Sequence, residues 1–201
     1  MSRLVVVLPL TRLRPGESFP VSDWPLHITV LPPFHTDAAA SVLARVIAVV
    51  IARVIAAAPS GGATLMAVAG DDALFGRREN VPVTLVQANL TLTELNRALV
   101  DAMRPFASSP DEPAFTGPGF RAHITIKNGN RVQAGDVLTL SQLALVDMAP
   151  RSAAGGRTVL ATFPLPGAGP VPGSAEPVAD DDEGEEQGER DRQSEGDKIQ
   201  H

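Results

Sequence analysis

The chain of 201 residues has no cysteine and no tyrosine, and it contains only four histidines. The lack of cysteine excludes disulfide frameworks, thiolate metal sites and cysteine nucleophiles. Aromatic residues make up 4% of the chain, so a broad platform for stacking successive bases of a single strand is not expected. Hydrophobic residues make up 44%, which is enough to build a core. The chain can therefore fold, but few of its side chains can carry out chemistry.

Acidic side chains are concentrated at the C-terminal end. Residues 176–201 hold 11 acidic and 3 basic side chains, a net charge of −8, whereas the whole chain carries −6. The preceding residues therefore carry +2, a mild basicity that suits a small phosphate-bearing ligand better than long nucleic acid. From about Pro164 the chain is rich in proline, glycine and alanine. We predict one domain over residues 1–165 and a disordered tail over residues 166–201.

Neither a signal peptide nor a membrane span is expected. Pro9 ends the first apolar run too early for a signal-peptide core. The later apolar stretch, residues 42–58, contains Arg45 and Arg53 on one flank of the predicted helix. A membrane span needs roughly 20 residues with few charges. We therefore expect a cytoplasmic monomer that does not associate with membranes.

Hydrophobic patterning predicts an α+β fold. Two helices are expected, one capped by Asp37 and ending near Ala58, the other capped by Thr91, with Glu94 at the capping-box position, and ending near Met103. Strands are predicted over residues 4–10, 26–31, 64–69, 81–87, 120–127, 138–146 and 158–163. Helices this far apart among so many strands favour an antiparallel or mixed sheet over a doubly wound parallel one.

Two of the histidines lie in nearly identical pentapeptides. Residues 26–30 read Leu-His-Ile-Thr-Val, and residues 122–126 read Ala-His-Ile-Thr-Ile. Side chains alternate along a strand, so the His and Thr of each motif project from one face. A strand that faces solvent more usually carries Lys, Glu, Ser or Arg. The repeated His-x-Thr pattern, in a chain so poor in histidine, therefore indicates function.

Two such motifs facing each other would form a phosphodiester site. One imidazole can act as a base while the other, protonated, acts as an acid, because the ordinary pKa of histidine is about 6.5. The Thr29 and Thr125 hydroxyls can donate hydrogen bonds to the non-bridging oxygens of a phosphate. Zinc needs three or four ligands, and beyond His27 and His123 only His35 and scattered carboxylates remain. No metal or other cofactor is expected.

The paired motifs resemble the signature of the 2H phosphoesterase superfamily, which includes bacterial 2′-5′ RNA ligase-like proteins and cyclic nucleotide phosphodiesterases. The resemblance covers residues 2–165, including the segments 24–34 and 119–126 around the motifs. It implies two pseudo-symmetric lobes whose sheets form a central cleft, with one motif on each wall. It also implies that His27 and His123 are the acid/base pair and that Thr29 and Thr125 bind phosphate. Which histidine is the acid depends on the orientation of the substrate.

Further side chains are weaker candidates for substrate contact. Lys127 lies on the same face as Thr125 and can add positive charge beside a phosphate, although a lysine at the end of a strand is usually only solvated. Phe75, predicted in a loop bounded by Gly76, could stack on a nucleobase. Trp24, Phe34 and Phe120 could stack in the same way or pack in the core. Arg121 is a further possible phosphate contact.

The sequence thus predicts a metal-independent phosphodiesterase that hydrolyses or transesterifies 2′,3′-cyclic phosphates or 2′-5′-linked nucleotides, including short RNA, by in-line displacement. One alternative keeps this chemistry but takes cyclic oligonucleotide signalling molecules as substrate, as some phage members of the superfamily do. The other is a nucleotide- or RNA-binding module without turnover. Such a module would have no need for both histidines.

Overall fold

The computed structural model describes residues 1–58, 64–76, 78–107, 119–148 and 156–167. In chain order the elements are β1 (Ser2–Pro9), β2 (Ser18–Phe19), the 3₁₀ turn η1 (Val21–Asp23), β3 (His27–Thr36), α1 (Ala40–Ala57), β4 (Leu65–Phe75), β5 (Val81–Val86), α2 (Leu90–Met103), β6 (His123–Thr125), β7 (Val137–Leu140), β8 (Gln142–Asp147) and β9 (Arg157–Pro164).

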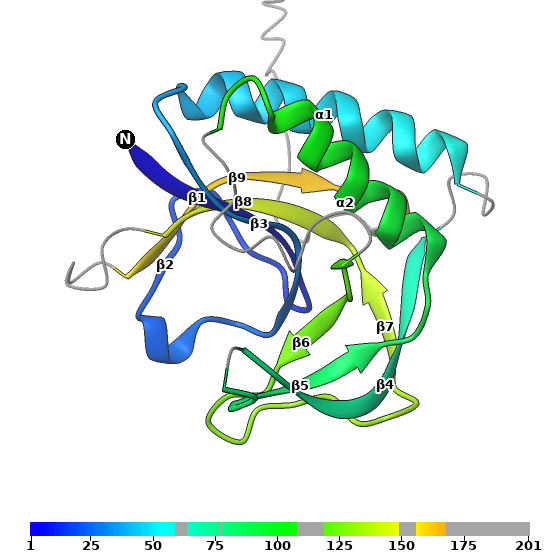
Figure 1. Ribbon diagram of the computed structural model, residues 1–201. Coiled ribbons are helices and arrows are strands. Elements are labelled where there is room, and N and C mark those ends of the chain that lie inside the picture. The colour runs from blue at the N-terminus through cyan, green and yellow to red at the C-terminus, as the bar shows by residue number, and fades with distance from the viewer. Residues whose placement is uncertain (59–63, 77, 108–118, 149–155, 168–201) are drawn as a thin grey trace, which may run out of the picture. The chain divides into compact units, whose positions relative to one another are not determined.

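The strands form one sheet in the order β2-β9-β8-β1-β3-β6-β5-β4-β7, and the sheet is visibly curled in Figure 1. Every strand pairing within the described ranges is antiparallel. The α+β class is therefore confirmed. β3 and β6 are neighbours in the middle of the strand order. The domain limit near residue 165 and the disordered tail stay predictions, because residues 168–201 lie outside the described part of the chain.

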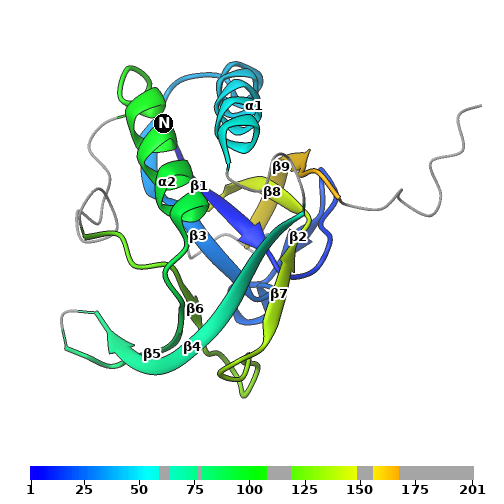
Figure 2. The same cartoon turned by 90° about the vertical axis from the view of Figure 1, so that its right-hand side faces the viewer.

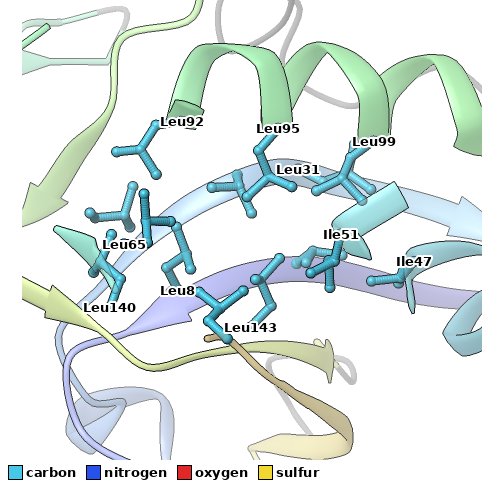
Figure 3. Packing of buried hydrophobic residues seen from close by; sticks show 14 of the residues in the cluster. Leu8, Leu31, Ile47, Ile51, Leu65, Leu92, Leu95, Leu99, Leu140 and Leu143 are labelled. Carbon is cyan, nitrogen blue, oxygen red and sulfur yellow. The ribbon is translucent and has the colours of Figure 1, made fainter. Parts of the chain in front are cut away.

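Both helices pack on the same face of the sheet, as the two views in Figures 1 and 2 show. Their buried residues recur every three or four positions, which gives each helix one apolar side. Figure 3 shows Ile47 and Ile51 of α1 and Leu95 of α2 packed over Leu8 and Leu143 of the sheet. By length and composition alone α1 could also cross a membrane, a property that it shares with core helices of soluble proteins.

The helix starts differ from the prediction. Ala39, not Asp37, precedes α1, and the Asp37 carboxylate instead pairs with the N-terminal ammonium at 3.1 Å. Asn89 caps α2, its Oδ1 accepting a hydrogen bond from the backbone N–H three residues later at 3.1 Å. Thr91 and Glu94 therefore lie inside the helix. The prediction failed because asparagine caps at least as well as threonine and comes first in the chain.

Several predicted strand limits also differ in the structure. β3 does not end at residue 31 but continues through Pro32 and Pro33 to Thr36, because its pairing with β1 shifts at the prolines and resumes at Phe34. β6 is shorter than the predicted range 120–127, and the predicted strand 138–146 is two strands separated at Ser141. β4 continues to Phe75, for which the sequence predicts a loop. The pairing of β4 with β5 shifts between Ala69 and Asp72, where β4 has one extra residue, and then continues to Phe75.

The face of the sheet away from the helices carries a second, smaller core. Leu13 is buried there against Val7 and Val159, and Phe19 and Trp24 pack at its margin. Residues 10–26 therefore cover this face over β1, β8 and β9. The small core anchors Trp24, which lies three residues before the first histidine motif.

A buried hydrogen bond joins α2 to β3. Val6 of β1 pairs with Leu31, and the next residue of β1 pairs with Thr29, so Val30 is an extra residue in β3. The Val30 carbonyl accepts a hydrogen bond from Asn96 Nδ2 at 2.9 Å, and Asn96 is 1% exposed. The bond satisfies a backbone carbonyl next to the first motif.

We predict that Asn96→Ala lowers the free energy of unfolding by about 1–3 kcal/mol, because a buried carbonyl loses its donor. Urea denaturation followed by circular dichroism measures the change. Leu90→Ala is the control, since Leu90 lies on the same helix and is 80% exposed. Equal stability losses for the two variants would contradict the role given to Asn96.

Candidate active site

The pairing of β3 with β6 brings the two His-x-Thr motifs together. Ile28 pairs with Ile124, and both isoleucines are 0% exposed. In an antiparallel ladder this register sets His27 opposite Thr125, and Thr29 opposite His123. All four side chains therefore project from the face opposite the two isoleucines.

The two histidines are diagonal neighbours in this arrangement. Such neighbours lie roughly 7–8 Å apart in an antiparallel ladder, within reach of long side chains. One phosphate group can therefore lie between the imidazoles with a threonine hydroxyl on each side. The structure brings together all four residues that the motifs predicted, while their roles stay a prediction.

The two imidazoles are oriented by the same local hydrogen bond. His27 Nδ1 lies 2.7 Å from the Pro25 carbonyl oxygen, and His123 Nδ1 lies 2.7 Å from the Arg121 carbonyl oxygen. A carbonyl only accepts, so Nδ1 carries the proton and donates in both rings. Each ring therefore exchanges protons with a substrate through Nε2.

An aromatic ring and an arginine support His27. The Trp24 ring stacks on the imidazole with centroids 4.1 Å apart and planes 28° apart. Arg157 Cζ lies 5.6 Å from the centre of the Trp24 ring. Arg157 is 4% exposed, and its Nη1 donates to the Met148 carbonyl at 2.6 Å. Trp24 and His27 themselves are half-buried.

His123 is supported by the same kinds of side chain from different elements. The Phe75 ring, at the end of β4, lies 4.5 Å from the imidazole and is tilted by 49°. Arg121 Cζ lies 5.1 Å from the centre of the Phe75 ring. Arg121 is exposed, unlike Arg157. The two histidines thus have matching supports that differ in their access to solvent.

The surroundings of the site disfavour protonated imidazoles. Burial is the largest influence on His27 and lowers its pKa to about 4, against a partly opposing hydrogen bond to the Pro25 carbonyl. The charges of His123 and Lys127 lower this pKa further. Burial also lowers the pKa of His123, and the positive charge of Arg121 adds to that effect. Both rings are therefore neutral at pH 7, and an anion between them would raise both pKa values.

Lys127 links the second motif to the segment before the first. Its Nζ donates to the Val21 carbonyl, and Asn128 Nδ2 donates to the Ser22 carbonyl at 3.1 Å. These bonds hold η1, which immediately precedes Trp24. Lys127 also lies close enough to His27 to affect its pKa. Contact between Lys127 and a phosphate stays a prediction.

Other aromatic and basic candidates lie elsewhere or have another role. Phe120 is partly buried and packs against the core on the helix side of the sheet. His35 pairs with Arg3 near the far end of β3. Sequence reasoning missed Arg157, because its contact with Trp24 joins positions 133 residues apart. Trp24 is a candidate for base stacking by sequence, whereas the structure stacks it on His27.

We predict that His27 in the free protein gains its proton near pH 4. In the unfolded chain the ordinary pKa of about 6.5 applies, so the unfolded state binds more protons between pH 6.5 and 4. The stability contributed by neutral His27 is complete above that window and is lost as pH falls through it. An NMR titration of the imidazole signals, assigned with His27→Gln, measures the midpoint. A His27 midpoint near pH 6.5 would contradict the burial argument.

Comparison with known proteins places the chain in a family. The model of the 2′-5′ RNA ligase superfamily matches residues 6–147. The fold is similar to that of E. coli LigT complexed with 3′-AMP, at 15% identity and a TM-score of 0.50, over 82% of this chain and 98% of LigT. A protein from Thermus thermophilus is 20% identical over 81% of this chain and 97% of its own, with a TM-score of 0.43.

No curated protein sequence matches the chain. The family match nevertheless spans more than half of the chain, from within β1 to the end of β8. It includes both strands that carry the histidine motifs. The chain therefore belongs to the 2′-5′ RNA ligase superfamily, the 2H phosphoesterases that the two motifs resemble.

Proposed function

We propose that the protein is a metal-independent phosphodiesterase in which His27 and His123 act as the acid/base pair. The observation that carries the proposal is the pairing of Ile28 with Ile124, which sets both imidazoles and two threonine hydroxyls on one face. Each imidazole has its Nδ1 proton bound to a backbone carbonyl. Each therefore presents the one nitrogen that can exchange a proton with a substrate.

The reaction proceeds by displacement at phosphorus. One neutral imidazole accepts, through Nε2, the proton of a water molecule or a ribose hydroxyl. The oxygen attacks phosphorus, and the bond from phosphorus to the leaving oxygen breaks. The other imidazole, protonated before the reaction, gives its Nε2 proton to that oxygen. Thr29 and Thr125 donate hydrogen bonds to the non-bridging oxygens as charge builds on them.

We propose 2′,3′-cyclic phosphates or 2′-5′-linked short nucleotides as substrates. A net charge of about +2 outside the acidic end supports a small anionic ligand. The LigT structure of similar fold contains 3′-AMP, the kind of nucleotide that opening a 2′,3′-cyclic phosphate can release. Within the described ranges, no three His, Asp or Glu side chains cluster in a way that could hold a metal ion, which supports chemistry by the imidazoles themselves.

We predict that His27→Ala and His123→Ala each lower kcat on a nucleoside 2′,3′-cyclic phosphate by about 10²–10⁴-fold, because each variant loses one proton-transfer group. Activity should be unchanged in excess EDTA. His35→Ala is the matched control, since His35 lies near the far end of β3. Product release is followed by chromatography.

Two results of this assay would remove the proposal. If a variant carrying both His27→Ala and His123→Ala still turns over substrate, the catalytic assignment is wrong. Loss of activity on chelation would contradict the metal-independent mechanism. Nucleotide binding with no turnover by the unmodified protein would instead favour a binding module. A panel of cyclic dinucleotides and trinucleotides tests whether signalling molecules are the better substrates.

We also predict that kcat/KM has a bell-shaped pH dependence with its maximum below neutral pH. The active form has one neutral and one protonated imidazole, and in the free protein one pKa is about 4 and the other is below its usual 6.5. The maximum of kcat should lie at higher pH, because a bound phosphate stabilises the imidazolium. Initial rates over pH 3.5–8.5, roughly spanning both limbs, measure both profiles, and coinciding maxima would contradict this reasoning.

A further inference from the structure

Arg157, at the start of β9, is a buried charged side chain that takes no part in the proposed proton transfers. It is 4% exposed, although arginine is almost never fully buried unless it is paired. Its Nη1 donates to the Met148 carbonyl at 2.6 Å, and its Cζ lies 5.6 Å from the centre of the Trp24 ring. Moving a guanidinium out of water costs free energy. Its position against this particular ring therefore points to a function rather than to packing alone.

The Trp24 ring joins this guanidinium to the first histidine motif. It stacks on the His27 imidazole with centroids 4.1 Å apart and planes 28° apart. Trp24 is half-buried and packs at the margin of the small core on the face away from the helices. Apolar packing therefore covers only part of the ring, and the contact with Arg157 supplies a further restraint.

His27 needs two restraints to present Nε2 in one direction. The hydrogen bond from Nδ1 to the Pro25 carbonyl, at 2.7 Å, fixes one edge of the ring. A ring held by one hydrogen bond can still turn about that bond, and a stacked neighbour sets its plane. Displacement of a reacting group by about 1 Å can lower a rate by roughly 10²-fold. A change that loosens Trp24 should therefore affect proton transfer at His27.

The arginine on the His123 side is placed differently. Arg121 Cζ lies 5.1 Å from the centre of the Phe75 ring, but the Arg121 side chain is exposed. Arg121 also precedes His123 by two residues, and its own carbonyl accepts the hydrogen bond from His123 Nδ1. Arg157, by contrast, is buried and comes from a strand distant in sequence from His27. It therefore restrains its aromatic neighbour from a fixed part of the sheet.

Building on the proposed phosphodiesterase function, we infer that Arg157 is a positioning residue for His27. It holds the Trp24 ring against the imidazole and thereby fixes the direction of Nε2 toward the reacting proton. Arg157 keeps its own proton, because a guanidinium is always charged in proteins, and it acts through Trp24. The part of the chain that the family model matches ends at residue 147, so family membership does not imply this role.

Kinetics on a nucleoside 2′,3′-cyclic phosphate test the role of Arg157. Arg157→Met should lower kcat by about 10- to 100-fold with little change in KM, because a misdirected imidazole affects the transition state more than binding. Arg157→Lys keeps a cation that can lie over an aromatic face and should retain more of the activity. Arg97→Met is the matched control, since Arg97 is an exposed arginine on α2, where it pairs with Glu94.

Variants of Trp24 test whether Arg157 acts through this ring. Trp24→Leu should lower kcat as much as Arg157→Met does, and a variant with both changes should be no worse than either alone, because the two residues act as one unit. Trp24→Phe keeps a ring that can stack and should retain most of the activity. Additive losses in kcat, or an unchanged kcat in Arg157→Met, would overturn the inference.

A substrate without a base separates this role from stacking of Trp24 on a nucleobase. The losses in kcat should be the same on glycerol 1,2-cyclic phosphate, because the imidazole is misdirected whatever the substrate carries. A loss confined to the nucleoside substrate and to KM would assign Trp24 to the base, and the inference about Arg157 would then be wrong.

Nitrogen NMR of the histidine rings at neutral pH reports on positioning without turnover. In the unmodified protein His27 should carry its proton on Nδ1, as the bond to the Pro25 carbonyl requires. In Arg157→Met a share of that proton should move to Nε2, while His123, bonded to the Arg121 carbonyl, should keep its signals. Unchanged His27 signals would overturn the inference, and so would equal changes in both rings, which would indicate a general loss of structure.

Circular dichroism checks that each variant is folded, and Trp24→Leu takes the place of Arg157→Met in the NMR measurement if the latter does not fold. A change confined to His27, with no turnover by the unmodified protein, would overturn the proposed function and leave the positioning of the ring standing. Normal turnover with no effect of Arg157→Met would do the reverse.

Discussion

The short pairing between β3 and β6 is the constraint on which the site depends. β6 has only three residues, and Ile28 and Ile124 are the pair that joins it to β3. Both isoleucines are sealed in the core beneath the helices. Since neighbouring side chains of a strand point to opposite faces, burial of these two residues forces the flanking histidines and threonines to the other face. The core thus decides on which face of the sheet these polar residues lie.

Burial and charge together make the site dependent on its ligand. Burial lowers the pKa of both imidazoles. The positive charge of Lys127 lowers the pKa of His27 further, and that of Arg121 lowers the pKa of His123 further. An anionic phosphate supplies the opposite charge and makes an imidazolium favourable when it is needed. Lys127 has a second structural role, because it holds the η1 turn, and through that turn it positions Trp24 against His27. Lys127 therefore both lowers the pKa of His27 and binds the turn that precedes Trp24.

The α+β class and the two His-x-Thr strands could be predicted from sequence, because alternation and helical spacing are local patterns that a single chain displays. The cap of α2 is Asn89 and not the predicted Thr91, since several residues in a row can serve as caps. Phe75 is a candidate by sequence, but its position at the end of β4 follows from its pairing with Val81 of β5, which no local pattern shows. Contacts such as Trp24 with Arg157 join distant positions and leave no local pattern. The chemical roles of the site residues and the limit of the domain stay predictions.

The strand order has a consequence for how the protein is made. β1 is buried on both faces and lies between β3 and β8, yet β8 begins only at Gln142. During synthesis from the N-terminus, one hydrogen-bonding edge of this apolar strand therefore waits for a partner encoded much later. Unpaired strand edges in incomplete chains are prone to aggregation. β1 therefore keeps one unpaired apolar edge until the chain has been synthesised past β8.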